Sequence, residues 1–126
     1  MRFFLDNNLS EQLARGMKEF GEDVVHLKEF FAADTDDPVW LERIGSEGWF
    51  LITRDDRVRF RPAELTALKE NRVGAFFLGG KNLNRCQLNQ QVVRNWPRIK
   101  EYARKTRTPF AYRIPPRGAK FVSLPL

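Results

Sequence analysis

The chain has 126 residues, 42% hydrophobic and 13% aromatic, which is enough apolar material to bury a core and excludes a disordered chain. Its single cysteine, Cys86, excludes an intramolecular disulfide and a thiolate metal cage, and it favours a reducing, cytoplasmic location. The apolar run of residues 3–5 is too short for a signal peptide or a membrane span, so we expect neither export nor membrane insertion.

The net charge of +6 is divided unevenly along the chain. Residues 1–80 contain 11 Lys/Arg and 15 Asp/Glu, whereas residues 81–126 contain 11 Lys/Arg and one acid, Glu101. An acidic segment that can hold cations, followed by a basic segment that can hold phosphates, is typical of an enzyme that acts on nucleic acid. The alternative is a solvated basic surface that binds nothing specific.

Short apolar runs alternate with helical patterns in the first two thirds of the chain. The runs that predict strands are residues 1–5, 23–27, 49–53 and 73–78. Apolar positions three and four residues apart predict helices between them, over residues 9–21, 37–48 and 62–71. In the first helix we expect a capping box of Asn8 and Glu11 and an inward Phe20, and in the second an N-cap at Asp37.

The last third of the chain predicts one long helix and a short extended end. Residues 84–105 form the helical pattern, with a kink expected at Pro97, and residues 110–114 and 120–124 predict terminal strands. The alternation of strands and helices predicts an α/β fold in which helices flank a mostly parallel sheet in three layers. We expect a single domain over residues 1–126, with an acidic α/β core followed by a basic helix and a C-terminal extension.

Four aspartates stand where this pattern changes from one element to the next. Asp6 ends the first strand, Asp55 and Asp56 follow the third, and Asp37 begins a helix. Loops at the carboxyl ends of parallel strands converge in one crevice, where these carboxylates would repel one another without a cation. Mg²⁺ and Mn²⁺ prefer such oxygen ligands, so we predict a metal site made by these four acids with the amide of Asn7.

A neighbouring amide supports this metal-site hypothesis, and each acid also has an alternative structural role. Asn8 can add a ligand or orient a carboxylate. Each acid also has a structural interpretation, as a helix cap for Asp37, a buried strand end for Asp6 and a turn for residues 55–56. Zinc is not expected, because only His26 and Cys86 offer softer ligands, and His26 lies in an apolar run that predicts a core position.

The segments LDNNL (residues 5–9) and LITRDD (residues 51–56) resemble those of PIN-like domains related to VapC toxins and to the Mut7-C group, over roughly residues 1–80. The resemblance implies a compact parallel sheet and an endoribonuclease that depends on Mg²⁺ or Mn²⁺, often the toxin of a toxin–antitoxin pair. It makes Asp6 the first-strand carboxylate, Asp37 the helix carboxylate and Asp55 the carboxylate after the third strand. Related domains often have a second acid two positions later, where this chain has Arg57, so the adjacent Asp56 is expected to matter less.

The expected reaction is metal-assisted hydrolysis of RNA phosphodiester bonds without a covalent nucleophile. Basic side chains are expected to position the phosphates, namely Arg54, Arg57, Arg94, Arg98, Lys100, Arg104, Lys105 and Arg107. Bases can stack on Trp96, Tyr102 or Tyr112, although core packing is the more frequent role of such residues. The expected partners are RNA, a protein antitoxin and a second copy of the chain.

Two other function classes stay open. The first is a PIN-like nucleic-acid-binding or interaction module with weak or no catalysis, which would bind RNA independently of Mg²⁺ and of Asp6. The second is a phosphoacceptor signalling domain, because this class also places acids at strand ends of a parallel sheet, and Lys81 follows the fourth strand. Against it stands the single aspartate of the first strand, followed by two asparagines where that class favours paired acids.

Overall fold

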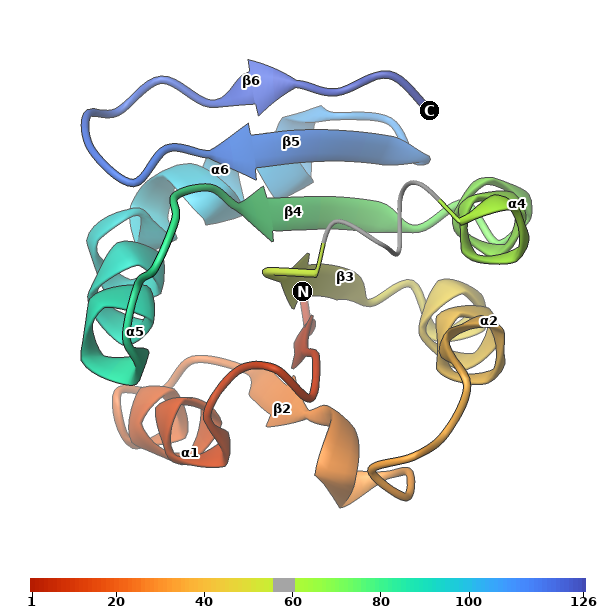
Figure 1. The fold of residues 1–126 in the computed structure, drawn as a ribbon, viewed down its shortest axis with the longest axis horizontal. Coiled ribbons are helices and arrows are strands. Elements are labelled where there is room, and N and C mark those ends of the chain that lie inside the picture. Colours follow the sequence, from red (N-terminus) through yellow and green to blue (C-terminus); the bar gives the residue numbers. More distant parts are fainter. Residues whose placement is uncertain (56–60) are drawn as a thin grey trace.

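The computed structural model describes residues 1–55 and 61–126, which form a six-stranded sheet with helices on both faces (Figure 1). The strands are β1 (Phe3–Leu5), β2 (Val24–His26), β3 (Phe50–Thr53), β4 (Gly74–Leu78), β5 (Phe110–Ile114) and β6 (Val122–Ser123). Their order is β2-β1-β3-β4-β5-β6, and all neighbours are parallel except β5 and β6. The prediction of an α/β fold with a mostly parallel sheet is confirmed.

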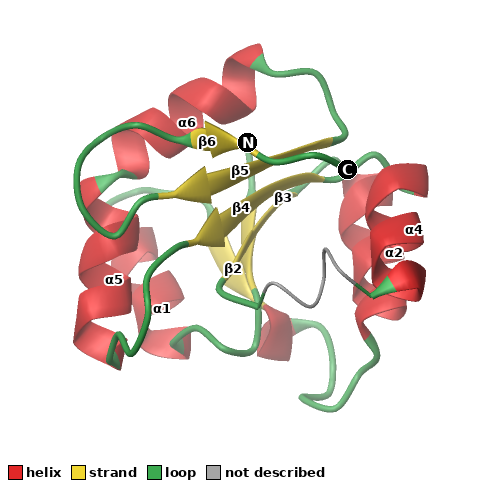
Figure 2. Ribbon diagram, turned by 45° about the horizontal axis from the view of Figure 1, so that its top comes forward, coloured by secondary structure: helices red, strands yellow, loops and turns green. Residues whose placement is uncertain are grey.

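The helices cover the sheet from two sides, as Figures 1 and 2 show. They are α1 (Glu11–Glu19), the 3₁₀ turn η1 (Leu27–Glu29), α2 (Asp37–Glu47), α4 (Pro62–Glu70), α5 (Arg85–Arg94) and α6 (Trp96–Lys105). Apolar residues of α1, α5 and α6 share one core cluster, and those of α2 and α4 share the other. Strand residues alternate between the two clusters: Phe3 and Leu5 of β1 belong to the first and Phe4 to the second. Within the described residues, no helix is long and apolar enough to cross a membrane.

Two details of the first helix differ from the sequence prediction. The N-cap of α1 is Ser10, whose hydroxyl accepts a hydrogen bond from the Gln12 N–H at 3.1 Å, so the predicted capping box of Asn8 and Glu11 is wrong. Phe20 is 81% exposed and does not point inward, because α1 ends at Glu19 and Phe20 already belongs to the following turn. Asn8 is therefore free of a capping role and lies in the loop that follows β1.

The predicted long helix is two helices, α5 and α6, separated at Asn95. Pro97 lies in the first turn of α6, where its missing N–H leaves no hydrogen bond unmade, whereas in the interior of one continuous helix its ring would clash with the preceding turn. The buried Asn95 amide donates to the Gln91 carbonyl oxygen at 2.7 Å and holds the junction. The interruption was expected as a kink and is a full break.

The strand order reverses at one point in the sheet. The chain adds β2 on one side of β1 and then adds β3 on its other side, so the order reverses at β1 and β3. In open α/β sheets, ligands bind in the crevice beyond the carboxyl ends of the strands at such a reversal. The register pairs Leu5 with Ile52, and the Asp6 N–H donates to the Ile52 carbonyl oxygen at 3.1 Å. Asp6 and Thr53 therefore lie side by side at the edge of this crevice.

Candidate active site at the carboxyl ends of β1 and β3

Asp6 is a buried carboxylate, with only 6% of the residue exposed. Its Oδ2 accepts a hydrogen bond from the Thr53 hydroxyl at 2.8 Å, and its Oδ1 accepts one from the Asn7 N–H. Burial raises the pKa of Asp6, although the hydrogen bonds from Thr53 and Asn7 act in the opposite direction. Thr53 and Asn7 thus fix the orientation of this carboxylate, and no Lys or Arg in residues 1–55 and 61–126 forms an ion pair with it.

Thr53 connects the loops that follow β1 and β3. Its fully buried hydroxyl donates to Asp6 and accepts from the Asp55 N–H at 2.9 Å, and the Asn8 side-chain amide approaches it at 3.5 Å. The side-chain Oδ1 of Asn8 in turn accepts from the Arg54 backbone N–H at 3.3 Å. The role of Thr53 was not predicted from the sequence, although its place at the end of a strand, two residues before Asp55, was a usable signal.

Asp37 reaches the same crevice from the start of α2. It is the first residue of this helix, the N-cap position is Asp36, and the prediction that Asp37 caps the helix is therefore wrong. Its Oδ1 accepts a hydrogen bond from the Trp40 indole N–H at 3.2 Å. Burial, and then the negative charges of Asp6, Glu64 and Asp55, raise the pKa of Asp37 to about 6. Acids that follow β1 and β3, together with one from α4, therefore disfavour the charged form of Asp37 by electrostatic repulsion.

Glu64 is the acid of this group that sequence analysis missed. It lies in the first turn of α4, its side chain is only 12% exposed, and it forms an ion pair with Arg61 at 3.7 Å. An acid in the first turn of a helix is ordinarily explained by the helix dipole, so its position in the sequence carried no functional signal. Only the packing of α4 beside α2 brings its charge close enough to affect Asp37.

Three of these aspartates border a cavity of about 250 Å³, which we call the acidic cavity. Its lining includes Asp6, Asn7, Asn8, Asp37 and Asp55. The structure thus brings together the described members of the predicted site from three separate segments of the chain. The predicted site residue Asp56 and the predicted phosphate contact Arg57 lie outside the described residues.

The donor atoms of the acidic cavity fit a hard divalent cation. No group of three or more His, Cys, Asp or Glu side chains in residues 1–55 and 61–126 is already arranged as a metal site. Mg²⁺ nevertheless commonly takes only one or two carboxylates and completes its coordination with water. Burial is the main cause that raises the pKa values of Asp6 and Asp37, and the negative charges of neighbouring acids raise them further. Asp6, Asp37 and Asp55, with the Asn7 amide, are the groups that would hold such an ion.

The basic residues expected to contact phosphates are distributed over several parts of the molecule. Arg54 follows β3 directly and lines a second cavity next to the acidic one. Arg94 and Arg98 border a shallow pocket beside Glu101, and the Arg94 guanidinium donates to the Pro116 carbonyl oxygen at 2.8 Å. Of this group, Arg54 is the described residue nearest in the chain to the acids, and its proposed RNA contact stays a prediction.

The cations of α6 and the turn after it are less well placed to reach the acids. Lys100 forms a 2.8 Å ion pair with Glu22. The helix then runs back toward the start of β5, where Phe110 pairs in register with Gly74, the first residue of β4. Arg104, Lys105 and Arg107 therefore lie toward the amino ends of the strands, away from the acidic cavity. A role for them in binding RNA stays a prediction, but it would be remote from the site of chemistry.

The aromatic residues considered for base stacking belong to the core. Trp96 is 7% exposed and meets Phe3 edge-on with ring centroids 4.7 Å apart. Tyr102 lies against Tyr112 at 4.6 Å and against Phe121 at 4.9 Å. The expected core role of these rings is confirmed.

His26 also has the expected core role, because it is 2% exposed. Its Nε2 lies 2.8 Å from the Leu9 carbonyl oxygen, and its Nδ1 accepts from the Lys28 N–H at 3.1 Å. Both ring nitrogens are therefore used within the fold, and His26 is not placed to act as a catalytic base.

Comparison with known families decides the classification of this site. Residues 1–80, which carry Asp6, Asp37, Asp55 and Glu64, match the PIN-like domain family over more than half of the 126-residue chain. The chain belongs to the PIN-like domain family. PIN-like domains have a nuclease-type fold, are typically nucleases and generally use divalent metals. No curated protein and no solved structure matches the chain.

The match also defines what the PIN-like domain contains in this protein. It spans β1 to β4 with α1, α2 and α4, which together supply all the described acids of the cavity. The helices α5 and α6 and the strands β5 and β6 lie beyond the matched residues but continue the same sheet. The single domain over residues 1–126 stays a prediction.

Proposed function

We propose that this PIN-like protein is a ribonuclease that depends on Mg²⁺ or Mn²⁺ and hydrolyses RNA phosphodiester bonds at the acidic cavity. The observation that carries the proposal is the convergence of Asp6, Asp37 and Asp55 at the point where the strand order reverses. The membership of a family whose members are typically nucleases supports it. A solely structural role does not explain why like charges from separate elements are gathered around one cavity.

The contacts of the residues in and around the cavity suggest a separate role for each of them. Thr53 and the Asn7 N–H hold the Asp6 carboxylate in one orientation, and Thr53 also fixes the backbone of Asp55. A bound divalent cation supplies positive charge that stabilises the developing negative charge on the phosphoryl group. Arg54, next to Asp55 in the chain, is the described cation best placed to neutralise the substrate phosphate. Preorganisation of the carboxylates is thus the contribution of the fold to catalysis.

More specific parts of the proposal rest on the family resemblance. They are the role of toxin in a toxin–antitoxin pair, an antitoxin protein as partner, a homodimer and a cytoplasmic location. A neighbouring small reading frame that encodes an antitoxin would support the first two. Size-exclusion chromatography with light scattering would test the homodimer.

The test of the ribonuclease proposal is RNA cleavage by protein purified free of other nucleases. We expect cleavage with Mn²⁺ or Mg²⁺, none with EDTA, and a loss of kcat/KM of more than about a hundredfold in Asp6→Asn and in Asp55→Asn, because each removes a charge that holds the ion. The Asp56→Asn variant is expected to lose less. Asp34→Asn is the matched control, since Asp34 is exposed and does not line the acidic cavity.

Full metal-dependent activity in both Asp6→Asn and Asp55→Asn would assign the cleavage to a contaminant or to another site. RNA binding without cleavage, indifferent to Mn²⁺ and to Asp6→Asn, would instead identify a binding module. The strand order β2-β1-β3-β4-β5 is also that of flavodoxin-like signalling domains, so topology alone does not exclude a phosphoacceptor. Trapping of an acyl phosphate on Asp55 or Asp6 would support that alternative.

A further inference from the structure

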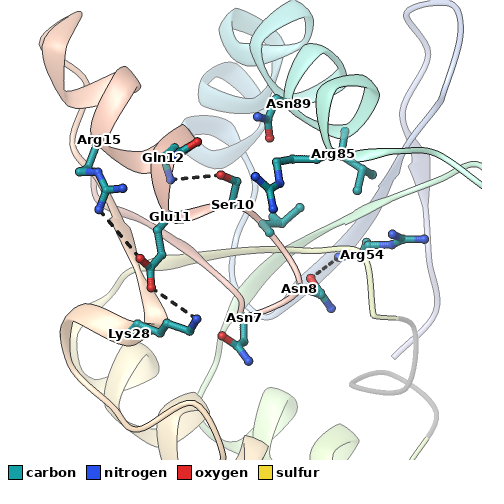
Figure 3. Close-up of a pocket in the computed structure, with 12 residues that line it drawn as sticks. Asn7, Asn8, Ser10, Glu11, Gln12, Arg15, Lys28, Arg54, Arg85 and Asn89 are labelled. Atoms are coloured by element: carbon teal, nitrogen blue, oxygen red, sulfur yellow. Dashed lines mark hydrogen bonds and ion pairs between the residues drawn. The ribbon is translucent and has the colours of Figure 1, made fainter.

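A second cavity, of about 450 Å³, lies next to the acidic cavity and shares Asn7 and Asn8 with it (Figure 3). We call it the basic cavity, because four cations from four parts of the fold line it. They are Arg15 of α1, Lys28 of η1, Arg54 after β3 and Arg85 at the start of α5. Among the described residues of its lining, the only acid is Glu11. The lining therefore carries an excess of positive charge beside a cavity that carries an excess of negative charge.

The cations of the basic cavity are not all neutralised by the protein. Glu11 faces both Arg15, at 3.9 Å, and Lys28, at 3.5 Å. Arg54 and Arg85 form no ion pair within residues 1–55 and 61–126. Figure 3 shows Arg85 extending from α5 toward Ser10, whereas the Arg54 side chain points away from Asn8 and Ser10. Arg54 and Arg85 thus bring to the lining of one polar cavity two guanidinium groups that form no ion pair with a described residue. Such groups are well suited to an oxyanion, since each presents several N–H donors in a fixed plane.

The wall between the two cavities is thin. Asn7 and Asn8 line both, and two residues of extended chain span at most about 7 Å. This wall is also held in place, because the Asn8 side chain bonds to the Arg54 N–H and approaches Thr53. A polymer with regularly spaced phosphates can therefore lie across the Asn7–Asn8 loop with one phosphate at each cavity.

We propose that the basic cavity binds the phosphate adjacent to the scissile one on a single strand of RNA. The proposal rests on the ribonuclease function proposed above and adds a substrate requirement to it. A substrate with a phosphate on only one side of the loop occupies the acidic cavity alone, whereas one with a second phosphate gains the contact to Arg85. The preferred substrates are accordingly strands with at least two consecutive phosphates.

The catalytic test compares substrates that share one scissile bond. Cleavage of a dinucleoside monophosphate is measured against that of the same dinucleotide with an added 5′ or 3′ terminal phosphate. For the wild type we expect kcat/KM to rise about tenfold with the phosphate on one of the two ends, as befits one charge-assisted contact. Arg85→Gln is expected to bring this ratio close to one. Lys69→Gln, which removes an equal charge from the exposed surface of α4, is expected to keep the wild-type ratio.

The ratio is independent of the overall rate, so a general loss of activity in a variant does not affect the conclusion. Arg85 is exposed at the first residue of α5, so its replacement is not expected to unfold the protein. No gain from either terminal phosphate in the wild type would overturn the proposal. An equal gain in wild type and Arg85→Gln would overturn it as well.

A binding measurement in EDTA separates this inference from the ribonuclease proposal. Fluorescence anisotropy with a labelled single-stranded RNA gives the slope of log affinity against log salt concentration, and we expect Arg85→Gln to reduce this slope by about one unit relative to Lys69→Gln. If the protein does not cleave RNA but this difference is found, the ribonuclease proposal fails and the phosphate site stands. If both variants give the same slope, the phosphate site fails whatever the catalytic result.

Discussion

The acidic and basic cavities share the Asn7–Asn8 loop but hold their charges in opposite ways. In the acidic cavity, Asp6 is buried and Asp37 half-buried, and burial together with like charge raises both pKa values. In the basic cavity, Arg54 and Arg85 are exposed on long side chains. The charged forms of the acids are thus destabilised, and a bound cation would relieve this. The arginines are in contact with water, and salt screens their attraction for an anion. Buried, hydrogen-bonded carboxylates suit metal binding, and exposed cations suit the capture of a polyanion.

The origin of the two cavities also shows how charge patterns along a chain can mislead. The charge pattern predicts phosphate contacts in the basic segment 81–126, but this segment contributes only Arg85 to the cations of the basic cavity. The other three, Arg15, Lys28 and Arg54, come from the segment in which acids outnumber bases. Crossover connections bring residues far apart in the sequence to the same end of a parallel sheet, so neighbouring charges in space need not be neighbours in the chain.

The largest effect within this comparison is expected from Thr53→Val, which removes the hydroxyl that holds Asp6 and the Asp55 N–H. We expect the Mn²⁺ concentration for half-maximal RNA cleavage to rise about 10- to 100-fold, because residues that orient metal ligands commonly matter by this factor. Thr53→Ser, which keeps the hydroxyl, should restore the wild-type value. Activity titrated with Mn²⁺ gives the result, and circular dichroism shows whether each variant is folded.

A wild-type Mn²⁺ dependence in folded Thr53→Val would show that Thr53 does not position the ligands. Binding of RNA in EDTA should be much less affected than the Mn²⁺ dependence, because the Thr53 hydroxyl does not belong to the basic cavity. The two measurements therefore test whether the cavities are separable.

A smaller effect is expected from Asp37→Asn, which removes one of the repelling charges. The pKa of Asp37 is about 6 in the folded protein against 3.8 ordinarily, so the folded state binds more protons between these values. Wild-type stability without metal should therefore fall as the pH rises from about 4 to above 6. At pH 7.5 the variant should be more stable than the wild type by about 1 kcal/mol, a value discounted for the partial exposure of the carboxylate. At pH 4 this advantage should vanish.

Urea unfolding in EDTA at the two pH values measures this difference. Glu42→Gln, which removes an acid from the exposed side of α2, is the matched control and should show no such pH dependence relative to the wild type. Added Mn²⁺ should stabilise the wild type more than Asp37→Asn. An unchanged pH dependence in Asp37→Asn would mean that burial and the neighbouring acids do not raise the pKa of Asp37.

The smallest effect is expected from Lys100→Gln, which removes a cation that belongs to neither cavity. Lys100 is paired with Glu22 at 2.8 Å, and the hydrogen bond from Lys100 is the main cause that lowers the pKa of Glu22. We expect a loss of about 0.5 kcal/mol of stability near neutral pH, present above the ordinary pKa of glutamate and fading as the pH falls below it. RNA affinity in EDTA should change less than in Arg85→Gln. A change in RNA affinity larger than that of Arg85→Gln would instead show that Lys100 contacts the RNA.

The class of fold and three of the acids were predictable from the sequence for simple physical reasons. Buried parallel strands need continuous apolar runs, and each of the runs containing Phe3, Val24, Leu51 and Phe76 forms a strand. Residues that follow such a run directly lie at the carboxyl edge of the sheet, so the positions of Asp6 and Asp55 followed from the pattern alone. The start of α2 at Asp37 was likewise set locally, by the proline that follows it.

Other features were decided only when the elements packed together. Local sequence could not show that Thr53 would share its hydroxyl between Asp6 and Asp55, because that contact depends on the register of β1 against β3. Nor could it show that Glu64 would act on Asp37, which requires α4 to lie beside α2, or that Arg85 would join Arg54 around one cavity. Local patterns determine which residues start and end an element, whereas charges and hydroxyl groups acquire their partners only through contacts between segments distant in the chain.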